Sequence, residues 1–162
     1  MSSRLRTLAA GTGLVLMIAG GTMALAADEP ANMIKYRQNL MKANGANLGM
    51  IAAVVKGEIS LTDDLAENAE SLAELGEMLS ANLQQLFPEG TGKESGVKTI
   101  ALPAIWEKWA EFEQVAMRFQ EESAKLAEVA EGGDMVAIGQ QVGVLGKEGC
   151  GACHETFREK DS

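Results

Sequence analysis

Residues 62–86 read TDDLAENAESLAELGEMLSANLQQL, and the spacing of their apolar side chains indicates a helical fold. Apolar or small residues recur every three or four positions, at Leu65, Ala69, Leu72, Gly76, Leu79, Leu83 and Leu86. This period places them on one face of an α-helix. We predict a helix over this segment, capped by Thr62, with Asp63 and Asp64 beside the positive end of its dipole. Pro88 and Gly90 end the segment.

Three other segments show the same period. In the segment from Asn32 to Lys56, apolar residues recur every seven positions at Ile34, Met41, Leu48 and Val55. After a loop over 87–102, a third stripe follows Pro103 at Ile105, Trp109, Phe112, Ala116, Phe119, Ser123, Leu126 and Ala130. The fourth stripe follows Asp134, a predicted cap, at Met135, Ile138, Val142 and Leu145. The sequence therefore predicts an all-α, antiparallel four-helix bundle.

The composition agrees with one helical domain. The chain has 162 residues, of which 46% are hydrophobic and only 4% aromatic. This length suits a single domain with a packed core. The formal net charge of -9 argues against nucleic acid as a partner, because proteins that bind nucleic acid are basic.

The N-terminal segment has the layout of a secretory signal peptide. Arg4 and Arg6 precede an apolar run over residues 8–18, and Ala24-Leu25-Ala26 forms an A-x-A cleavage site. The alternative is a transmembrane anchor, but the run is short and rich in glycine. No cysteine lies near the cleavage site, so a lipoprotein is excluded. We expect residues 1–26 to be removed, residues 27–162 to form the domain, and the mature protein to occupy the periplasm without stable membrane association.

The sharpest motif is Cys150-Gly151-Ala152-Cys153-His154, which holds both cysteines and the only histidine of the chain. C-x-x-C-H is the attachment signature of c-type haem. On a helix, the two thiols and the imidazole share one face, so the thiols can join the vinyl groups while His154 binds the iron. A zinc site lacks a fourth ligand, and a thioredoxin-like motif lacks its βαβ context. A disulfide stays open as an alternative.

Three glycines precede the motif along the fourth segment. On an α-helix, Gly139, Gly143 and Gly146 lie on the face that carries Cys150. Each glycine costs a helix about 1 kcal/mol relative to alanine, which suggests that something large and flat approaches this stripe. Haem fits that role, and close packing of another helix is the alternative.

The chain resembles the class II cytochromes c, the family that includes cytochrome c'. Three stretches carry the resemblance: 35–42 (KYRQNLMK), 102–106 (LPAIW) and 150–158 (CGACHETFR). The motif near the C-terminus is also typical of the family. The resemblance implies one covalent haem c per chain, with Arg37 near a haem propionate and Arg158 beside the proximal pocket. A solvated surface arginine is the alternative for Arg37.

The resemblance also gives Met41 its importance, because this position faces the distal side of the haem. It implies that Met41 is the sixth iron ligand, as in the low-spin, methionine-ligated subgroup, or that it only packs. Ligation predicts a one-electron carrier that is not an enzyme and serves an unidentified redox partner protein. The alternative is a five-coordinate protein that binds nitric oxide or carbon monoxide. A peroxidase is disfavoured, because the first segment offers Asn44 and Asn47 but no histidine.

Two further expectations concern association. Basic residues flank the haem-contacting segments and would form a positive rim for an acidic partner if they cluster; ordinary solvated lysines are the alternative. They are Lys35, Arg37, Lys42, Lys147, Arg158 and Lys160. Family resemblance implies either a monomer or a homodimer.

Overall fold

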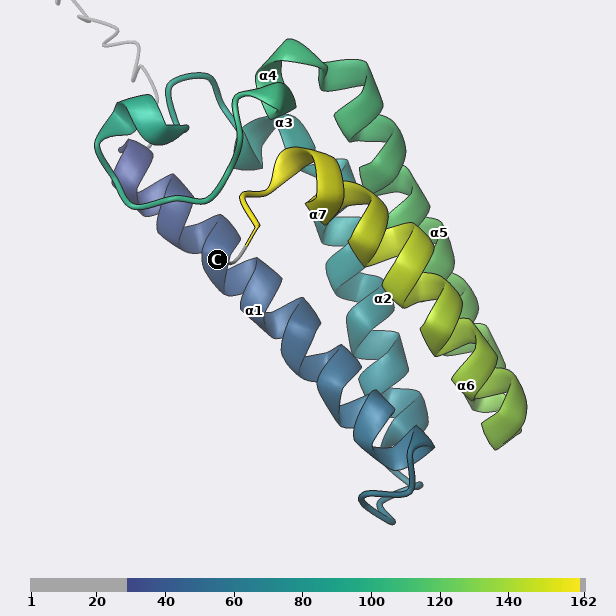
Figure 1. The fold of residues 1–162 in the computed structure, drawn as a ribbon. Helices are drawn as coiled ribbons and strands as arrows, with labels where there is room; N and C mark the ends of the chain where they lie inside the picture. Colours follow the sequence, from purple (N-terminus) through teal and green to yellow (C-terminus); the bar gives the residue numbers. More distant parts are fainter. Residues whose placement is uncertain (1–28, 161–162) are drawn as a thin grey trace, which may run out of the picture.

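The computed structural model describes residues 29–160, and the predicted signal peptide lies outside this range. Its elements follow one another along the chain as shown in Figure 1. The bounds are α1 Pro30–Val55, α2 Leu65–Ala81, α3 Leu83–Leu86, η1 Lys93–Ser95, α4 Ala104–Glu107, α5 Trp109–Glu131, α6 Met135–Val144, η2 Leu145–Gly151 and α7 Ala152–Phe157. Within this range no helix is sufficiently long and apolar to cross a membrane.

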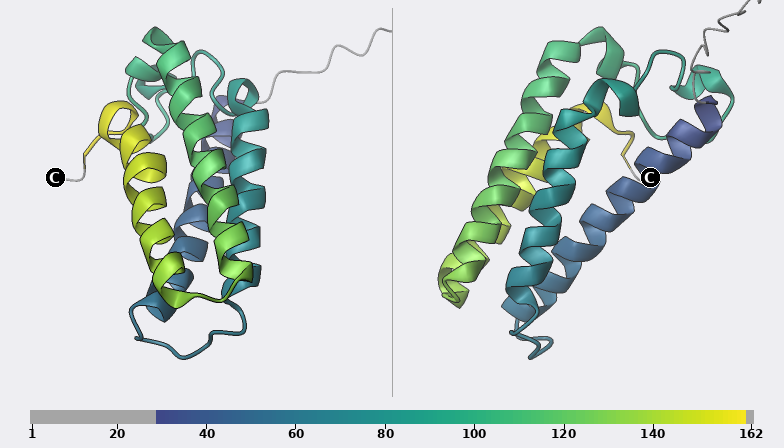
Figure 2. Two further views of the ribbon diagram at one scale, coloured as in Figure 1. Left: turned by 90° about the vertical axis from the view of Figure 1, so that its right-hand side faces the viewer. Right: turned by 180° about the vertical axis from the view of Figure 1, so that it is seen from behind.

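The predicted four-helix bundle is confirmed. Its four rods are α1, α2, α5 and the run α6–η2–α7, and successive rods are antiparallel (Figures 1 and 2). The largest interface joins α2 to α5, and α1 packs mainly on α2. Residues 29–160 contain no β-strand, only an isolated bridge between Ala101 and Arg158.

The stripe of residues 62–86 forms the centre of the core. Leu65, Ala69, Leu72, Gly76 and Leu79 are buried along α2. A Cβ atom at Gly76 would lie 2.5 Å from Ser123 Oγ and 3.4 Å from Gln120 Cα. Glycine is therefore required there for the close approach of α2 to α5, which explains why the apolar stripe contains it.

The ends of the predicted helices differ from the structure in three places. Thr62 is not the side-chain cap of the second helix: Asp64 is the N-cap residue and no side chain caps it. Thr62 contributes its carbonyl, which accepts from Leu65 N at 3.2 Å. The second and third predicted helices are each broken once, at Asn82 and at Lys108, where φ and ψ leave the helical region. Both breaks fall inside continuous apolar stripes, so periodicity alone did not reveal them.

The fourth helix begins as predicted and then changes its winding. Asp134 caps α6 by accepting hydrogen bonds from Val136 N and Ala137 N at 2.9 and 3.3 Å. From Leu145 to Gly151 the chain is a π-helix, and α7 follows. The prediction of one continuous α-helix is wrong here, and the assignment of the glycines and Cys150 to one face loses its α-helical basis beyond Leu145. A π-helix inserts extra residues into a turn and is frequent at functional sites.

Aromatic side chains close the end of the bundle near α7. The ring of Phe112, at the start of α5, lies 4.9 Å from that of Phe87 and 5.1 Å from that of Phe157, between centroids. Phe87 starts the loop after α3, and Phe157 ends α7. These edge-on contacts tie three distant segments together.

Candidate haem site

One contact sets the register between α1 and the last rod. A Cβ atom at Gly139, in α6, would lie 3.1 Å from Val55 Cγ1, at the end of α1. The two rods are antiparallel, so equal steps from this contact lead to residues that lie level with each other. Eleven steps pair Asn44 with Cys150, and fourteen pair Met41 with Cys153. Each residue of the π-helix over Leu145–Gly151 rises less than an α-helical residue, so these pairings hold to about one turn.

The two rods diverge beyond that contact. Helix α1 packs against α6 but makes no comparable contact with η2 or α7. Figure 1 shows the backbones separating from the α6 end towards the α7 end. Cβ atoms placed at Gly143 and Gly146 would meet nothing within 4 Å. The motif therefore lies where the last rod has moved away from α1.

The three glycines divide into two kinds. At Gly139 the alternative applies, since the glycine permits close packing on Val55. Gly143 and Gly146 instead have open space beside them, which agrees with a flat group at this position.

Both cysteines are half-buried and pack against the hydrophobic core, and no disulfide joins them. Burial raises the pKa of the Cys150 thiol, and burial together with Cys150 raises the pKa of Cys153 to about 12. Both thiols are therefore protonated at neutral pH. Reactive thiol–disulfide pairs depend on a lowered pKa, so this environment does not favour redox exchange.

His154 follows Cys153 in α7 and is half-buried. Arg158 follows the end of the same helix and is also half-buried. The assigned roles of both residues stay predictions.

Arg37 is the most deeply buried cation near the site, with 3% of its surface exposed. Its Nη1 donates to Thr91 Oγ1 at 2.7 Å and to Leu86 O at 3.4 Å, and its Nη2 donates to Thr91 O and to Thr99 Oγ1. The guanidinium also lies 4.8 Å from the Phe87 ring centroid. Burial lowers its pKa to about 10. The alternative of a solvated surface arginine is wrong, and the propionate role stays a prediction.

The loop that holds Arg37 also joins α1 to the end of α7. Gln38 Nε2 donates to Lys98 O at 3.0 Å. Two residues on, Glu159 N donates to Ile100 O at 2.8 Å, and Leu102 N donates to Phe157 O at 3.0 Å. Residues 98–102 therefore bridge the two rods at the end where they diverge.

Asn44 is buried in α1 with one polar atom unsatisfied. Its exposure is 8%, and its Nδ2 donates to Leu40 O at 3.1 Å. Its Oδ1 has no hydrogen-bond partner. Level with Cys150 by this count and one helical turn from Met41, the buried acceptor fits a site that holds a further group. Met41 itself is half-buried and packs against the core.

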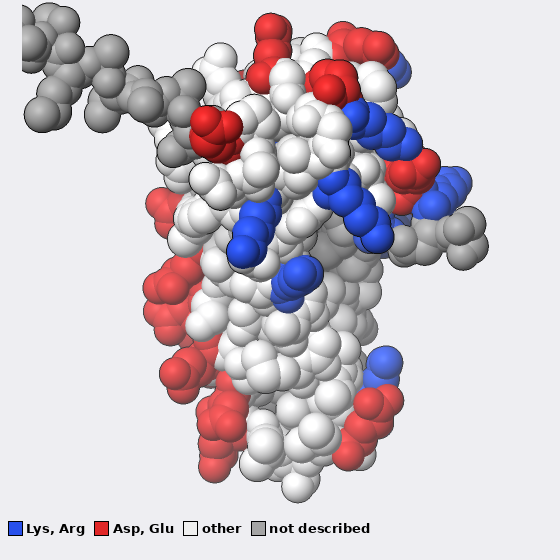
Figure 3. Space-filling view, turned by 90° about the vertical axis from the view of Figure 1, so that its left-hand side faces the viewer, with Lys and Arg blue, Asp and Glu red and all other residues white. Residues whose placement is uncertain are grey.

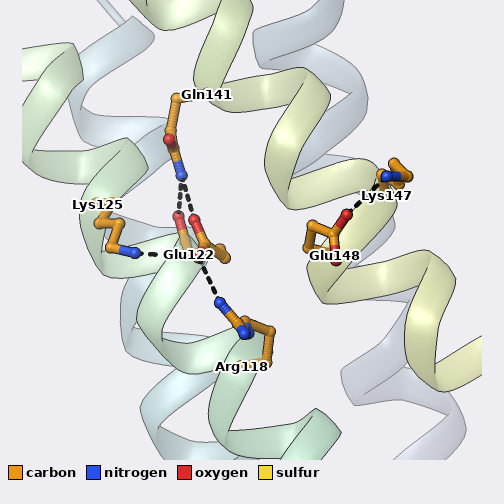
Figure 4. Close-up of polar contacts among 6 residues, drawn as sticks. All are labelled: Arg118, Glu122, Lys125, Gln141, Lys147 and Glu148. Atoms are coloured by element: carbon orange, nitrogen blue, oxygen red, sulfur yellow. Dashed lines mark hydrogen bonds and ion pairs between the residues drawn. The ribbon is translucent and has the colours of Figure 1, made fainter.

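A buried carboxylate locks α5 to α6, and sequence analysis missed it. Glu122 is 3% exposed and accepts from Gln141 Nε2 at 2.9 Å and from Lys125 Nζ at 3.0 Å, while Arg118 Nη1 lies 3.5 Å away (Figure 4). These hydrogen bonds lower the pKa of Glu122. The signal was present, because Glu122 lies within the buried stripe between Phe119 and Leu126. Gln141, the α6 partner of Glu122, lies four residues before η2 begins.

Basic side chains gather on one half of the α1 face. Figure 3 shows them near the α3–α4 loop, with acidic side chains along one edge of the same face. Lys35 and Lys42 of α1 and Lys98 of the loop after η1 are exposed. The predicted rim needs two corrections. Arg37 is buried, and Lys147 is paired with Glu148 at 2.8 Å.

A helical bundle with C-x-x-C-H near its end, facing a diverging helix, defines a c-type haem protein of the four-helix class. The chain belongs to the cytochrome c' family, because the family model described as "Cytochrome C'" matches residues 32–158. It is 37% identical to cytochrome c' of Pararhodospirillum photometricum over 131 residues, which cover 80% of this chain and 98% of that protein.

Solved structures agree with this assignment. Cytochrome c' of Rubrivivax gelatinosus matches with a TM-score of 0.71 at 28% identity, covering 82% of this chain and 98% of that one. A nitric oxide complex of a cytochrome c prime variant from Alcaligenes xylosoxidans matches with a TM-score of 0.69 at 30% identity and the same coverage. Proteins of this family carry one covalent haem c per chain, so the predicted cofactor is confirmed.

Proposed function

We propose that this chain is a periplasmic haem c protein that binds nitric oxide or carbon monoxide on the side of the iron that faces α1. The divergence of α1 from η2 and α7 carries this proposal, because it separates the motif from the helix opposite. The nitric oxide complex of a related protein supports the same ligand class. No substrate is turned over, so the protein is not an enzyme.

In this proposal, Cys150 and Cys153 hold the haem by thioethers and His154 binds the iron from the α7 side. The haem supplies an iron that takes a small diatomic ligand when bound. The chain's own residues exclude water and fix the geometry. Leu40 and Ile51 keep the buried face of α1 apolar, and the Glu122–Gln141 contact fixes α6 ahead of the motif. Arg37 and the loop that it binds close the α7 end.

A second function has its own supporting observation. Counted from the Val55–Gly139 contact, Met41 is level with Cys153, which supports its sulfur as the ligand of a one-electron carrier. This is the low-spin subgroup predicted from the sequence. The comparisons support the gas-binding function better, since the solved relatives include a nitric oxide complex. The basic cluster near the α3–α4 loop would then meet an acidic redox partner.

One experiment separates the two functions. We would record optical spectra of the pure holoprotein, ferric and ferrous, and then titrate the ferrous form with carbon monoxide. High-spin spectra and ready carbon monoxide binding are expected for the gas-binding function. Low-spin spectra in both states, with no carbon monoxide uptake, would show that a side chain occupies the sixth position and would move the function to electron transfer.

Export is a separate part of the proposal. We propose that residues 1–26 are a signal peptide and that the mature chain begins near Ala27 or Asp28. N-terminal sequencing of protein from the periplasmic fraction tests this. Recovery of the intact Met1 end from the membrane fraction would contradict both cleavage and periplasmic location.

A further inference from the structure

Asn44 is the one polar side chain on the buried face of α1 whose bonding the fold leaves incomplete, among the residues that the structure describes. Arg37, the other buried polar residue of α1, has its terminal nitrogens hydrogen-bonded to Thr91, Thr99 and Leu86. An unsatisfied buried acceptor destabilises the fold, because it has lost its hydrogen bonds to water. A partner that is not part of the polypeptide would remove this cost.

The position of Asn44 says where that partner lies. Counted from the Val55–Gly139 contact, Asn44 is level with Cys150. It is one helical turn from Met41, on the face of α1 that turns towards the core. The last rod carries the open glycines 143 and 146 in this region. The partner would therefore be a molecule between α1 and the haem.

The chemistry of the free atom says what the partner is. The Asn44 amide nitrogen is engaged by Leu40 O, which leaves the carboxamide oxygen as a hydrogen-bond acceptor. It can accept only from a ligand that carries hydrogen on nitrogen or oxygen. Nitric oxide and carbon monoxide carry none. Leu40 and Ile51, the buried neighbours of Asn44 along α1, are apolar and do not compete for such a ligand.

We propose that Asn44 determines specificity among the ligands of the haem: its carboxamide oxygen accepts a hydrogen bond from small N–H or O–H ligands and leaves the binding of diatomic gases unchanged. The proposal deepens the proposed function and rests on it, because both require an open side of the iron. Asn44 would bind the ligand and not the iron.

The chain contains a matched control. Asn47 Nδ2 donates to Ala43 O at 3.1 Å, the same local bond that Asn44 makes to Leu40. Asn47, however, is half-exposed, so water can satisfy its amide. Asn44→Leu and Asn47→Leu therefore remove the same group from two environments on one helix.

The experiment uses the holoprotein with two probes, ammonia on the ferric form and carbon monoxide on the ferrous form. Asn44→Leu should weaken ammonia binding about tenfold, the loss expected for one hydrogen bond, and leave carbon monoxide affinity within about twofold. Asn47→Leu should change neither. The infrared stretch of bound carbon monoxide should fall in Asn44→Leu, because a carboxamide oxygen facing the ligand opposes charge transfer onto it. Asn44→Ala should repeat these results if leucine does not fit.

Each variant is also made in a Met41→Ala background. If the wild type binds neither probe but Met41→Ala binds both, the gas-binding function fails while Asn44 is still tested. Equal ammonia affinity and an equal carbon monoxide stretch in the Asn44 and Asn47 variants would overturn the specificity proposal. Failure of the Met41→Ala protein to bind either probe would overturn both proposals.

Discussion

The two ends of the last rod, α6–η2–α7, differ in how closely they pack against α1. At the α6 end, Gly139 lets the backbone come close to Val55, Ile51 is fully buried, and Glu122 ties α6 to α5. At the α7 end, the same rod leaves α1, Gly143 and Gly146 face open space, and Asn44 keeps an unsatisfied oxygen. The first end is completed by the polypeptide alone. The second fits a bundle that is completed by its cofactor.

The largest effect should come from removing the attachment at the α7 end. Replacing Cys150 and Cys153 together by serine should abolish covalent haem, because they are the only cysteines in the chain. Intact-mass measurement after acid–acetone extraction checks this against the wild type. Haem-sized added mass on the double variant would show that the haem is not attached through these two cysteines.

The next effect compares one residue from each end in the holoprotein. Ile51→Ala should lower the free energy of unfolding by about 2–5 kcal/mol, because its side chain is fully buried at the packed end. Met41→Ala should cost less, about 1–2 kcal/mol, since that side chain is half-buried. Chemical denaturation of both variants measures this. Equal losses would mean that Met41 is held as firmly as a core residue, as iron ligation would require.

A smaller, pH-dependent effect is expected from the hydrogen bond between Glu122 of α5 and Gln141 of α6. The folded pKa of Glu122 lies below its ordinary value of 4.5, because the ionised form accepts hydrogen bonds from Gln141 and Lys125. Its contribution to stability is therefore complete above pH 4.5 and is lost as the pH falls through the lower folded pKa. Glu122→Gln should flatten this loss of stability in acid.

Glu121→Gln is the control for that measurement, since Glu121 is the exposed neighbour on the same helix. Thermal unfolding at a series of pH values from 3 to 7 follows the difference. Identical acid profiles for the two variants would show that the ionised carboxylate of Glu122 does not stabilise the fold.

The smallest effects come from the glycines. Gly139→Ala should leave stability nearly unchanged, because the gain in helix propensity, about 1 kcal/mol, offsets a Cβ contact with Val55 that is tight by a few tenths of an ångström. Gly143→Ala has open space and would show the whole gain if nothing lay beside it. We expect no such gain in the holoprotein, because haem occupies that side. A full gain in thermal stability would place the haem elsewhere.

Features that depend on residues close together in the chain were predictable from the sequence. Stripes such as Leu65 to Leu86 predicted the helices, because a period of three to four residues suits only one structure. Asp134 predicted a cap, and the spacing of Cys150, Cys153 and His154 predicted the cofactor, because both depend on residues close together in the chain. The resemblance added the family and drew attention to Arg37 and Met41.

Features that depend on segments far apart in the chain became visible in the folded protein. The π-helix over 145–151, the breaks at Asn82 and Lys108 and the burial of Arg37 beneath residues 91–99 leave no periodic signal. The same holds for the register in which Asn44 lies level with Cys150, which is counted from the contact between Val55 and Gly139. Periodicity reports which face of a helix is buried. It does not report which residue lies opposite, because packing between helices fixes that.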